Sequence, residues 1–529
     1  MQVTLPHALQ TAAATRGDAD FLIHGDSALS YAALDASSRR LAAGLLALEI
    51  GPGDRIGILA LNQVEWIQLF FAATRIGATV VGMSLRYRDA ELAYMVQDSR
   101  IKAIAVLPHY EGTDFAAMLD RIAPDCPSLR HLITLETADA TSGDDIPAAK
   151  ISRLPHTAFS ELLAAEPDPR VAMLGQQTSP DATAMVIYTS GTTGRPKGAG
   201  LTHASMLASA SAQAEHMRLR PSDLLQIPVP LNHVGGITCG VLSMLLGGGR
   251  IDLIAEFKAK PVLERMRRYP PTLLGGVPTM MTLLLIHSEG LDLDLSTVRI
   301  IYIGGSNVDA ALLSQLERRC PGATLMNLYG LSETSGAIVM TPWDASDSDR
   351  LHTIGRPIGN ARVKVIAPDT GADLPVGEIG ELCFSSAGVI PGYVGAASEA
   401  SNAFADGWLK TGDLGRVNDR GVIELKGRAK DMYIQGGFNV YPAEIEGHIA
   451  RHQDVVMVAG IGVPDPVMGE IGRYYIVRRA GSALDEAQVR QWCAAHLADY
   501  KVPRQIVFRD ELPLTPAGKI QKAALREFP

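Results

Sequence analysis

The sequence predicts an α/β protein with a large N-terminal domain and a small C-terminal domain. Apolar segments with the period of a strand alternate with segments of helical period through the first 325 residues, a rhythm typical of a mostly parallel sheet covered by helices. A chain of 529 residues also exceeds what one hydrophobic core organises, so we expect two or more domains. Beyond residue 355, short strands separated by Gly/Pro turns favour a small antiparallel sheet or distorted barrel.

The expected domain boundaries lie where these patterns change. An N-terminal domain over residues 1–428 would contain α/β subdomains at about 1–180 and 181–325 and a β-barrel-like subdomain at about 326–426. A small, mobile α+β C-terminal domain would follow over residues 429–529, where the αβ rhythm restarts for a length that suffices for a separate domain.

Helices and strands alternate in the first subdomain. Residues 37–48 and 65–76 carry apolar side chains at helical spacing, and the apolar runs 56–60 and 79–82 predict buried strands. Residues 137–180 are rich in Ala, Asp, Pro and Ser without a clear period, which predicts an irregular connection.

The second subdomain repeats the alternation. The apolar run 184–188 predicts a buried strand, and hydroxyl residues within 202–205 favour the start of a helix. A turn at 229–236 leads into an apolar helix over 237–246, and 299–303 predicts another strand. Open α/β sheets bind ligands beyond the carboxyl ends of their strands, so the segment after residue 188 is a candidate site.

The remaining predicted elements are short. Strands are expected over 363–366, 380–384, 421–425, 455–463 and 474–477, and helices over 443–449 and 485–498. The first three of these strands would build the barrel-like subdomain, and the other elements would build the C-terminal domain.

Composition and charge exclude several classes of protein. The net charge of −9 disfavours a nucleic-acid binder. Five scattered cysteines without a C-x-x-C pair suit a reducing compartment and give no metal–thiolate site. The N-terminus lacks a secretory signal pattern, and no apolar run reaches the roughly 18 residues needed to span a bilayer. We expect a cytoplasmic protein with small-molecule partners and no membrane span; a homodimer is an assembly that the sequence leaves open.

The stretch over residues 188–198, Tyr-Thr-Ser-Gly-Thr-Thr-Gly-Arg-Pro-Lys-Gly, is the clearest candidate for chemistry. Its glycines let backbone N–H groups converge on one point, its hydroxyls add donors, and Lys197 adds a compact positive charge. Such a loop suits a phosphate. It is not a Walker A loop, because Gly194 is followed by Arg-Pro-Lys-Gly, which misplaces the lysine and lacks the closing hydroxyl.

A second candidate stretch, Tyr-Gly-Leu-Ser-Glu-Thr, contains Glu333. A carboxylate near phosphates is repelled unless a divalent cation lies between them, and Mg²⁺ favours oxygen ligands. Considered alone, Glu333 would more simply cap a turn or face solvent. In a chain that also carries a phosphate loop, a metal-binding role is favoured.

These stretches resemble the adenylate-forming superfamily, which includes acyl-CoA synthetases, peptide-synthetase adenylation domains and beetle luciferases. Eleven consecutive residues, 188–198, fit its phosphate loop, and five motifs in the expected order extend the resemblance over nearly the whole chain. Residues 431–446 look most like bacterial fatty-acyl and steroid-side-chain CoA ligases. The resemblance implies ATP, Mg²⁺ and coenzyme A as cofactors and co-substrates.

The resemblance also implies roles for residues of a nucleotide site. Lys197 and the loop would hold the phosphates, and Glu333 would bind Mg²⁺. Tyr329 would border the adenine, and Asp413 would accept hydrogen bonds from the ribose hydroxyls. The implied ATP- and AMP-binding set is Thr189, Ser190, Gly191, Thr192, Thr193, Gly194, Lys197, Gly305, Ser306, Asn327, Leu328, Tyr329, Gly330, Ser332, Asp413, Arg428 and Lys519.

A Pro-Leu-Thr-Pro-Ala-Gly-Lys segment near the end of the chain resembles the family's final motif. Its Lys519 would bridge the substrate carboxylate and the α-phosphate as negative charge builds up. The resemblance implies a hinge at Lys430, about which the small domain would turn to withdraw Lys519. The same turn would bring Gly436, Gly437 and Phe438 to the pantetheine arm of coenzyme A.

The sequence defines the carboxylic acid substrate less closely than it defines the nucleotide site. His233 matches the histidine that gates the carboxylate end of the family's pocket and is assigned a catalytic role; the implied acyl pocket is His233, Val234, Gly235, Gly305 and Gly330. Residues 227–246 contain no Asp or Glu, which disfavours an amino-acid substrate. Gly235, Gly236, Gly240 and Ser306 would either leave space for a long or bulky acyl group or serve close backbone packing.

The expected function is therefore ATP-dependent activation of a fatty or bulky hydrophobic acid and its transfer to coenzyme A. Three alternatives stay open at this point. The acid could be an aryl acid, or the product could be an acyl-adenylate delivered to a carrier protein. A non-catalytic nucleotide-binding relative would be expected to lose Lys519, Glu333 or Asp413, and all three are present.

Overall fold

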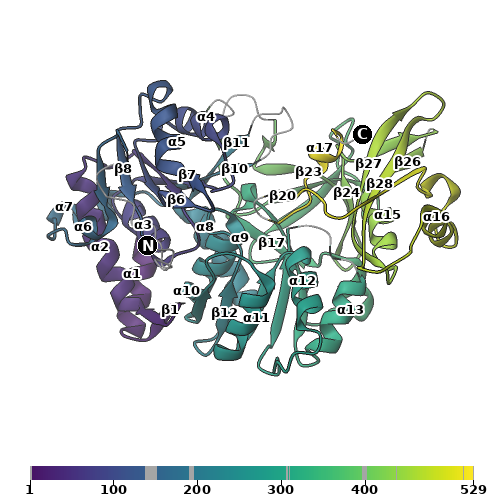
Figure 1. Cartoon of the computed structure of the whole chain (residues 1–529), viewed down its shortest axis with the longest axis horizontal. Helices are drawn as coiled ribbons and strands as arrows, with labels where there is room; N and C mark the ends of the chain where they lie inside the picture. The colour runs from purple at the N-terminus through teal and green to yellow at the C-terminus, as the bar shows by residue number, and fades with distance from the viewer. Residues whose placement is uncertain are drawn as a thin grey trace. The chain divides into compact units, whose positions relative to one another are not determined.

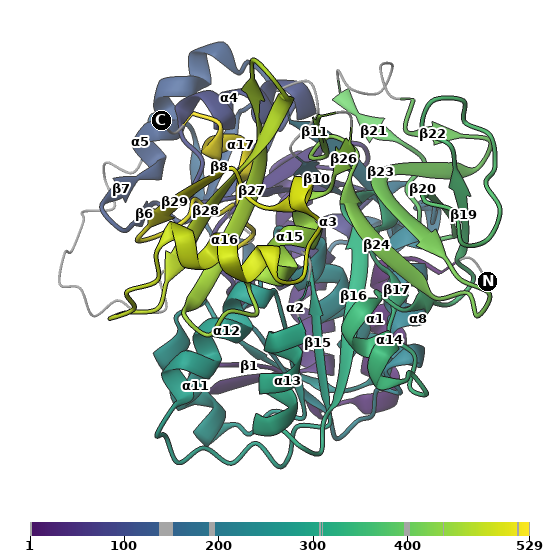
Figure 2. The ribbon, with the colours of Figure 1, turned by 90° about the vertical axis from the view of Figure 1, so that its right-hand side faces the viewer.

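The structure is a computed structural model that describes residues 3–136, 152–189, 196–305, 308, 310–395, 402–436, 438–515 and 518–527. It confirms the predicted α/β fold class, with helices and strands alternating along most of the chain (Figures 1 and 2). The chain forms two compact units. Unit 1 comprises Met1–Phe257, Leu331–Ala337 and Ser386–Phe404, and unit 2 comprises Lys258–Gly330, Ile338–Ser385 and Ala405–Pro529. The expected subdomain boundaries and the hinge near Lys430 stay predictions.

Among the described residues of unit 1, eight strands form the larger sheet, in the order β21-β11-β10-β4-β3-β5-β8-β9. They are β3 (Arg55–Leu59), β4 (Thr79–Met83), β5 (Ala103–Val106), β8 (His131–Thr134), β9 (His156–Ala158), β10 (Thr183–Thr189), β11 (Lys197–Thr202) and β21 (Tyr393–Val394). Neighbours from β10 to β9 run parallel, while β11 and β21 add antiparallel strands at one edge. The central strands are buried throughout, as expected of a parallel sheet covered on both faces.

A second group of strands in unit 1 comprises β1 (Asp20–His24), β2 (Ser27–Ser30), β12 (Leu224–Ile227) and β13 (Arg250–Leu253). Strands β12, β13 and β1 are parallel, and β2 returns antiparallel to β1. The remaining hairpin pairs β6 (His109–Tyr110) with β7 (Thr113–Asp114).

The helices of unit 1 include the predicted ones. They are α1 (Leu5–Arg16), α2 (Tyr31–Ala47), α3 (Val64–Arg75), α4 (Asp89–Ser99), α5 (Phe115–Ile122), the 3-10 turn η1 (Ala123–Asp125), α6 (Phe159–Leu163), α7 (Pro169–Gln177), α8 (His203–His216), α9 (Val234–Gly236), the π-helix η3 (Ile237–Leu242), α10 (Ser243–Gly247) and the 3-10 turn η4 (Ser332–Thr334). Helix α8 begins where the hydroxyl pattern predicts, because Thr202 accepts from the backbone N–H of Ser205 and caps it.

In unit 2, the parallel strands are β14 (Leu273–Gly276), β15 (Ile300–Gly304) and β16 (Thr324–Leu331), and β17 (Gly336–Met340) pairs antiparallel with β18 (Arg356–Pro357). Helices α11 (Ala259–Arg268), α12 (Pro278–Ser288), α13 (Ala310–Arg319) and α14 (Asp347–His352) accompany them. The expected antiparallel sheet contains β19 (Arg362–Ile366), β20 (Gly380–Ser385) and β23 (Trp408–Val417), in that order. Both β24 (Ile423–Arg428) and the short β22 (Phe404–Ala405) pair with β23.

The C-terminal part of unit 2 has its own sheet, in the order β26-β25-β28-β27, with β29 parallel to β28. Its elements are β25 (Tyr433–Gln435), β26 (Phe438–Val440), α15 (Pro442–Ile449), β27 (Val455–Asp465), β28 (Gly469–Arg478), α16 (Glu486–Ala494), the 3-10 turn η6 (Asp499–Lys501), β29 (Gln505–Arg509) and α17 (Lys522–Leu525). Tyr433, Tyr474 and Ile476 belong to its buried core.

The prediction of an irregular connection over residues 137–180 is wrong for its described part, which holds β9, α6 and α7. The Asp and Pro residues that suggested a loop are the start signal of a helix. Asp168 accepts from the backbone N–H of Arg170 and caps α7, and Pro169 fills the first turn, where its missing N–H costs nothing. The elements are too short to show a period.

The predicted helix over 485–498 is also too long. Helix α16 ends at Ala494, and its capping box at Asp485 and Gln488 defines its start. Helix α2 begins six residues before the predicted 37–48, and β28 begins five residues before the predicted 474–477. The other expected helices and strands lie within a few residues of their predicted ranges.

All five cysteines are described, and each is buried and free. Over the described residues, no helix combines the length and the apolar character that crossing a membrane requires.

Candidate active site

The predicted site residues are divided between the two units. Unit 1 holds Thr189, Lys197, His233, Val234, Gly235, Ser332 and Glu333, and unit 2 holds Gly305, Asn327, Leu328, Tyr329, Gly330, Asp413, Arg428, Lys430, Gly436, Phe438 and Lys519. Seven predicted residues lie outside the described ones: Ser190, Gly191, Thr192, Thr193, Gly194, Ser306 and Gly437. The residues predicted to bind phosphate thus belong to unit 1, and those predicted to bind ribose belong to unit 2.

The two stems of the phosphate loop belong to one antiparallel hairpin of unit 1. Thr189, the last residue of β10, pairs with Lys197, the first residue of β11. The hydroxyl of Thr189 donates to the backbone carbonyl of Lys197 at 3.4 Å. The fold thus fixes where the predicted loop leaves the sheet and where it returns.

Tyr393 contacts both Lys197 and Glu333, which are predicted to bind the phosphates and Mg²⁺. Lys197 Nζ lies 5.3 Å from the centroid of the Tyr393 ring, within the range of a cation–π contact. The Tyr393 hydroxyl donates to Glu333 Oε1 at 2.6 Å. Burial and the negative charge of Glu333 raise the pKa of Tyr393, so its hydroxyl stays a donor. Sequence reasoning missed Tyr393, because its place depends on the pairing of β21 with β11.

The backbone around Glu333 is held in a tight turn. Its carbonyl accepts from the backbone N–H of Ile390 at 2.9 Å, and Thr334 Oγ1 accepts from the backbone N–H of Leu331 at 2.8 Å. A carboxylate has acceptor capacity beyond one bond, so the contact with Tyr393 leaves room for a cation. No group of three or more His, Cys, Asp or Glu that could hold a metal exists among the described residues. One carboxylate that shares Mg²⁺ with substrate phosphates needs no such group, so Glu333 fits a magnesium ligand.

His233 caps the short helix α9, and its Nδ1 accepts from the backbone N–H of Gly235 at 3.3 Å. This bond assigns the imidazole proton to Nε2. The preceding Asn232 donates to the backbone carbonyl of Met83 at 2.9 Å, which anchors the turn. Val234 is buried. The structure thus holds the predicted gating histidine in one orientation.

The glycines near His233 serve packing at two positions. A Cβ at Gly236 would lie 2.3 Å from the carbonyl oxygen of Pro230, and a Cβ at Gly240 would lie 2.6 Å from Ile227 Cδ1. Both contacts are closer than real Cβ atoms allow, so these glycines permit close approach of neighbouring segments. Of the two open interpretations, the structure favours packing over free space for this pair.

In unit 2, Asp413 is the residue predicted to accept hydrogen bonds from the ribose hydroxyls. Its buried carboxylate accepts from the Tyr329 hydroxyl at Oδ2 (2.6 Å) and pairs with Arg428 Nε at Oδ1 (2.9 Å). Burial and the charge of Asp413 raise the pKa of Tyr329 well above its ordinary value, so Tyr329 remains a donor. Each carboxylate oxygen keeps a second lone pair, which ribose hydroxyls can use.

Asn327 presents a buried acceptor without a partner among the described residues. Its side-chain amide donates to the backbone carbonyls of Arg350 (3.1 Å) and Thr353 (2.7 Å), which fixes the orientation of the side chain. Its Oδ1 has no hydrogen-bond partner. A buried acceptor without a partner costs free energy, and Oδ1 has almost no accessible surface from which a ligand could donate to it.

Lys519 lies beside the predicted nucleotide segment of unit 2. A Cβ added at Gly305, directly after β15, would lie 3.0 Å from Cε and 3.7 Å from Nζ of Lys519. The loop that carries the lysine is fixed to α12, because Thr279 Oγ1 donates to the Gly518 carbonyl at 2.9 Å. β15 and β16 run close together there, since a Cβ at Gly304 would lie 2.5 Å from the Leu328 carbonyl. Gly330 follows in the same strand.

The predicted CoA-side and hinge residues lie in the C-terminal part of unit 2. Lys430 is exposed in the turn after β24. Gly436 has φ +58° in the hairpin that joins β25 to β26, a conformation that favours glycine. Phe438 is 55% exposed and stacks on Tyr500 with ring centroids 4.5 Å apart. This aromatic pair is a surface feature that the sequence reasoning did not include.

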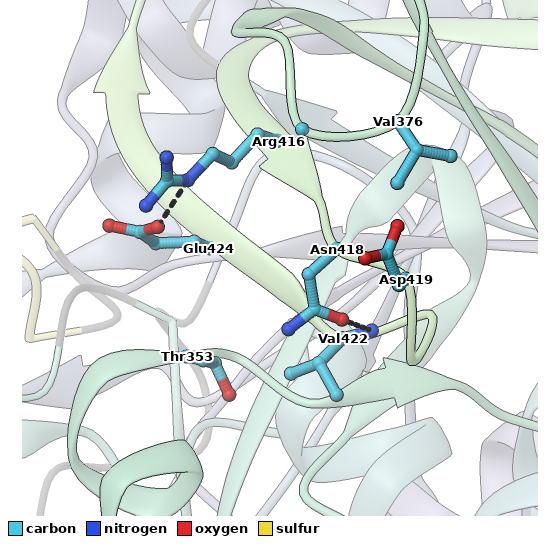
Figure 3. A pocket seen from close by; sticks show the side chains of 8 residues that line it. Thr353, Val376, Arg416, Asn418, Asp419, Val422 and Glu424 are labelled. Carbon is cyan, nitrogen blue, oxygen red and sulfur yellow. Dashed lines mark hydrogen bonds and ion pairs between the residues drawn. The ribbon is translucent and has the colours of Figure 1, made fainter.

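Figure 3 shows a pocket of about 250 Å³ in unit 2 that contains none of the predicted site residues. Three of its polar side chains are already paired: Arg416 Nε donates to Glu424 Oε2 at 2.5 Å, and Asn418 Oδ1 accepts from the backbone N–H of Val422 at 3.0 Å. We assign no ligand to it.

Two family descriptions match the chain. The AMP-binding enzyme family matches residues 9–394, and the AMP-binding enzyme C-terminal domain matches residues 444–519. A 3-[(3aS,4S,7aS)-7a-methyl-1,5-dioxo-octahydro-1H-inden-4-yl]propanoyl:CoA ligase of Rhodococcus jostii (strain RHA1) is 34% identical over 533 residues, covering 99% of this chain and 98% of the relative. A long-chain-fatty-acid–CoA ligase of Yersinia pestis is 32% identical over 538 residues, covering 98% and 93%.

A solved structure supports the same assignment. The anthranilate CoA ligase in complex with anthranoyl-AMP has a TM-score of 0.87 at 25% identity and covers 99% of this chain and 97% of its own. The likeness extends over both matched parts of the chain. The resemblance inferred from the motifs is thereby confirmed: this chain belongs to the AMP-binding enzyme family and is an AMP-forming acid–CoA ligase, which activates a carboxylic acid as an acyl-adenylate and transfers it to coenzyme A.

Proposed function

We propose that this ligase activates a fatty or bulky hydrophobic acid, and that Lys519 assists attack of the carboxylate on ATP. The position of Lys519 beside Gly305, at the carboxyl end of β15, is the observation that carries the proposal. A carboxylate oxygen bonds to the α-phosphorus while the bond to pyrophosphate breaks. An ammonium at this place offsets the negative charge that builds up in that transition state.

The nucleoside would be held by unit 2. Asp413 accepts the ribose hydroxyls with the lone pairs that Tyr329 and Arg428 leave, and the backbone at Asn327 and Leu328 runs along the base. The support for this assignment is the geometry at Asp413, whose two oxygens each have one partner in the structure. Tyr329 borders the base with its ring, while its hydroxyl stays on Asp413.

The phosphates would be held by unit 1. Lys197 supplies a positive charge at the end of the loop, and Tyr393 orients Lys197 and Glu333 together. Mg²⁺, when bound by Glu333 and phosphate oxygens, neutralises the phosphate charge. The protein's own contribution is to hold Glu333 in its turn and to keep one of its oxygens on the Tyr393 hydroxyl.

In the second half-reaction the C-terminal domain turns about Lys430, which withdraws Lys519 and brings the segment Gly436–Gly437–Phe438 to coenzyme A. The thiolate bonds to the acyl carbon, and AMP leaves with the electron pair of the broken C–O bond. His233 stands at the carboxylate end of the acyl pocket, where its Nε2–H can donate to the acid. The exposed Phe438 and the positive φ of Gly436 support a docking role for this hairpin.

The proposed class of acid is supported by the names of the relatives rather than by the volume of an acyl pocket. The Rhodococcus relative is named for a bulky bicyclic propanoate and the Yersinia relative for long-chain fatty acids. Residues 227–246 carry no charge that would hold an amino group. An aryl acid is the second candidate, favoured by the likeness to the anthranilate ligase.

The test is turnover of a panel of fatty, polycyclic and aryl acids with ATP and Mg²⁺, with and without coenzyme A, followed by pyrophosphate, AMP and thioester. Thioester from fatty or polycyclic acids is the expected result. Thioester from aryl acids alone would replace the substrate class. Pyrophosphate release without thioester would instead indicate an acyl-adenylate delivered to a carrier protein.

Lys519→Ala should lower adenylation by about 100-fold or more while thioester formation from supplied acyl-adenylate changes little. Lys522→Ala is the matched control. Lys522 lies three residues after Lys519 in the chain, and its Nζ pairs with Glu446 Oε1 at 2.6 Å. Equal losses in both half-reactions for Lys519→Ala would contradict its proposed role.

A further inference from the structure

One face of helix α4 contacts both stems of the phosphate loop. Tyr94 and Asp98 are four residues apart and therefore lie on the same side of the helix, with Ser99 next to them. Tyr94 and Asp98 are half-buried and Ser99 is buried. No sequence motif marks this helix, and none of these residues belongs to the predicted site.

The stem that enters the loop is held through Tyr188. Its hydroxyl donates to Asp98 Oδ2 at 2.6 Å and lies 2.7 Å from Ser99 Oγ, which then acts as the donor of that second bond. Tyr188 is buried and directly precedes Thr189. Burial and the bond to Asp98 raise its pKa, so the proton stays on the phenol.

The stem that leaves the loop is held through Pro196. The Tyr94 hydroxyl donates to the Pro196 carbonyl at 2.9 Å, one residue before Lys197. The ring of Tyr94 also meets the ring of Tyr188 edge-on, with centroids 6.1 Å apart. One helix therefore joins the residue before the loop to the residue at its end.

The same helix closely approaches the strand that carries Tyr393. A Cβ at Gly395 would lie 2.2 Å from Asp98 Oδ2, and Gly395 has φ +70°. A side chain at this place would displace the Asp98 carboxylate, and the backbone conformation favours glycine. Asp98 is thus packed between the stem of the loop and the end of β21.

We propose that Tyr94 and Asp98 of α4 are positioning residues for ATP, which act by holding the two stems of the phosphate loop at a fixed separation. Thr189 and Lys197 are the two ends of that loop, and the residues directly before them, Tyr188 and Pro196, are the ones that α4 holds. Anchored stems reduce the freedom that binding must remove, so the free energy of ATP binding becomes more favourable. The inference rests on the proposed function, in which this loop binds the phosphates.

Tyr94→Phe is the most selective test, because it removes one hydroxyl and keeps the ring against Tyr188. We expect the Kd for ATP with Mg²⁺, measured by calorimetry, to rise about threefold to tenfold, which corresponds to the loss of one hydrogen bond. The KM for ATP in adenylation should rise by the same factor. Thioester formation from supplied acyl-adenylate, which needs no phosphate loop, should stay within about twofold.

Tyr31→Phe is the matched control, since the buried Tyr31 hydroxyl also donates to one backbone carbonyl, that of Gly249, at 2.5 Å. It should leave the Kd for ATP unchanged. Tyr188→Phe, which removes the bonds to Asp98 and Ser99, should raise the Kd for ATP at least as much as Tyr94→Phe does. Thermal melting of each variant shows that it is folded.

Lys197→Ala separates this inference from the proposed function. If Lys197→Ala weakens ATP binding and Tyr94→Phe leaves the Kd at the wild-type value, the role of α4 is overturned. An equal loss of both half-reactions in Tyr94→Phe would also overturn it, because that pattern indicates a structural role. If Lys197→Ala itself has no effect on the Kd, the assignment of the loop to phosphate fails, and the inference with it.

Discussion

The two units present the same pair of groups in different surroundings. In unit 1 the Tyr393 hydroxyl donates to Glu333 at 2.6 Å, and in unit 2 the Tyr329 hydroxyl donates to Asp413 at 2.6 Å. The nearby cations differ. Lys197 lies over the ring of Tyr393 at 5.3 Å, whereas Arg428 pairs directly with the Asp413 carboxylate at 2.9 Å.

This difference predicts different uses for the two carboxylates. Lys197 contacts the ring of Tyr393, which leaves the Glu333 carboxylate to bind another cation. Asp413 already pairs with the Arg428 guanidinium through Nε, so we expect it to suit neutral hydroxyl donors better than a metal. In the proposed function, the placement of the cation, rather than the tyrosine–carboxylate bond itself, distinguishes the metal ligand from the ribose acceptor.

The largest effect should come from Glu333→Gln. An amide cannot neutralise a metal ion as a carboxylate does, so adenylation should fall by about 100-fold or more and the Mg²⁺ concentration for half-maximal rate should rise. Pyrophosphate release at varied Mg²⁺ measures both. Glu424→Gln is the control, since Glu424 pairs with Arg416 and Lys426 and is not one of the predicted site residues. A lower rate with an unchanged Mg²⁺ requirement would break the comparison.

Asp413→Asn should have an intermediate effect of another kind. It keeps an acceptor oxygen but removes the charge that pairs with Arg428, so AMP affinity should fall by about tenfold while the Mg²⁺ requirement stays the same. Calorimetry with AMP, which needs no metal, tests this directly. The exposed Asp419, in the turn between β23 and β24, provides an Asp→Asn control. A shift in Mg²⁺ requirement would show that the two carboxylates are not specialised.

The smallest and most selective effects should come from the tyrosines. Tyr393→Phe and Tyr329→Phe each remove one hydroxyl bonded at 2.6 Å. Tyr393→Phe should raise the Mg²⁺ requirement by about threefold, and Tyr329→Phe should weaken AMP binding by about threefold, because each loses the orientation of one carboxylate. Metal titration of adenylation and calorimetry with AMP distinguish them. Crossed effects, with Tyr393→Phe acting on AMP, would refute the separation of roles.

The elements that could be predicted from the sequence are those whose signals are local. The strand before the phosphate loop follows from one apolar run, and the start of α8 follows from the hydroxyl of Thr202, which caps it. The family, too, was identified from short motifs. Local patterns were therefore sufficient to predict the fold class and to select Lys197, Glu333 and Asp413 as candidate site residues.

The partners of those residues could not be predicted, because they depend on pairing between distant segments. Tyr393 and Glu333 are 60 residues apart, and Tyr94 and Pro196 are 102 apart. The use of Gly236 and Gly240 was open for the same reason, since only the neighbouring backbone decides whether a missing side chain leaves space. Helices α6 and α7 are too short for their apolar residues to show a helical period.

The burial of the five cysteines affects whether the enzyme's reactive products can acylate the enzyme itself. Burial raises the pKa of Cys239 to about 12 and that of Cys493 to about 11, and it also raises the pKa of Cys126. A thiol that is both covered and protonated is a poor nucleophile. Mixed anhydrides and thioesters can acylate an accessible thiolate, so an exposed reactive cysteine would be a target for both products. Among its described residues, the chain offers its products no such target, and an added disulfide reagent would report the thiol of coenzyme A alone.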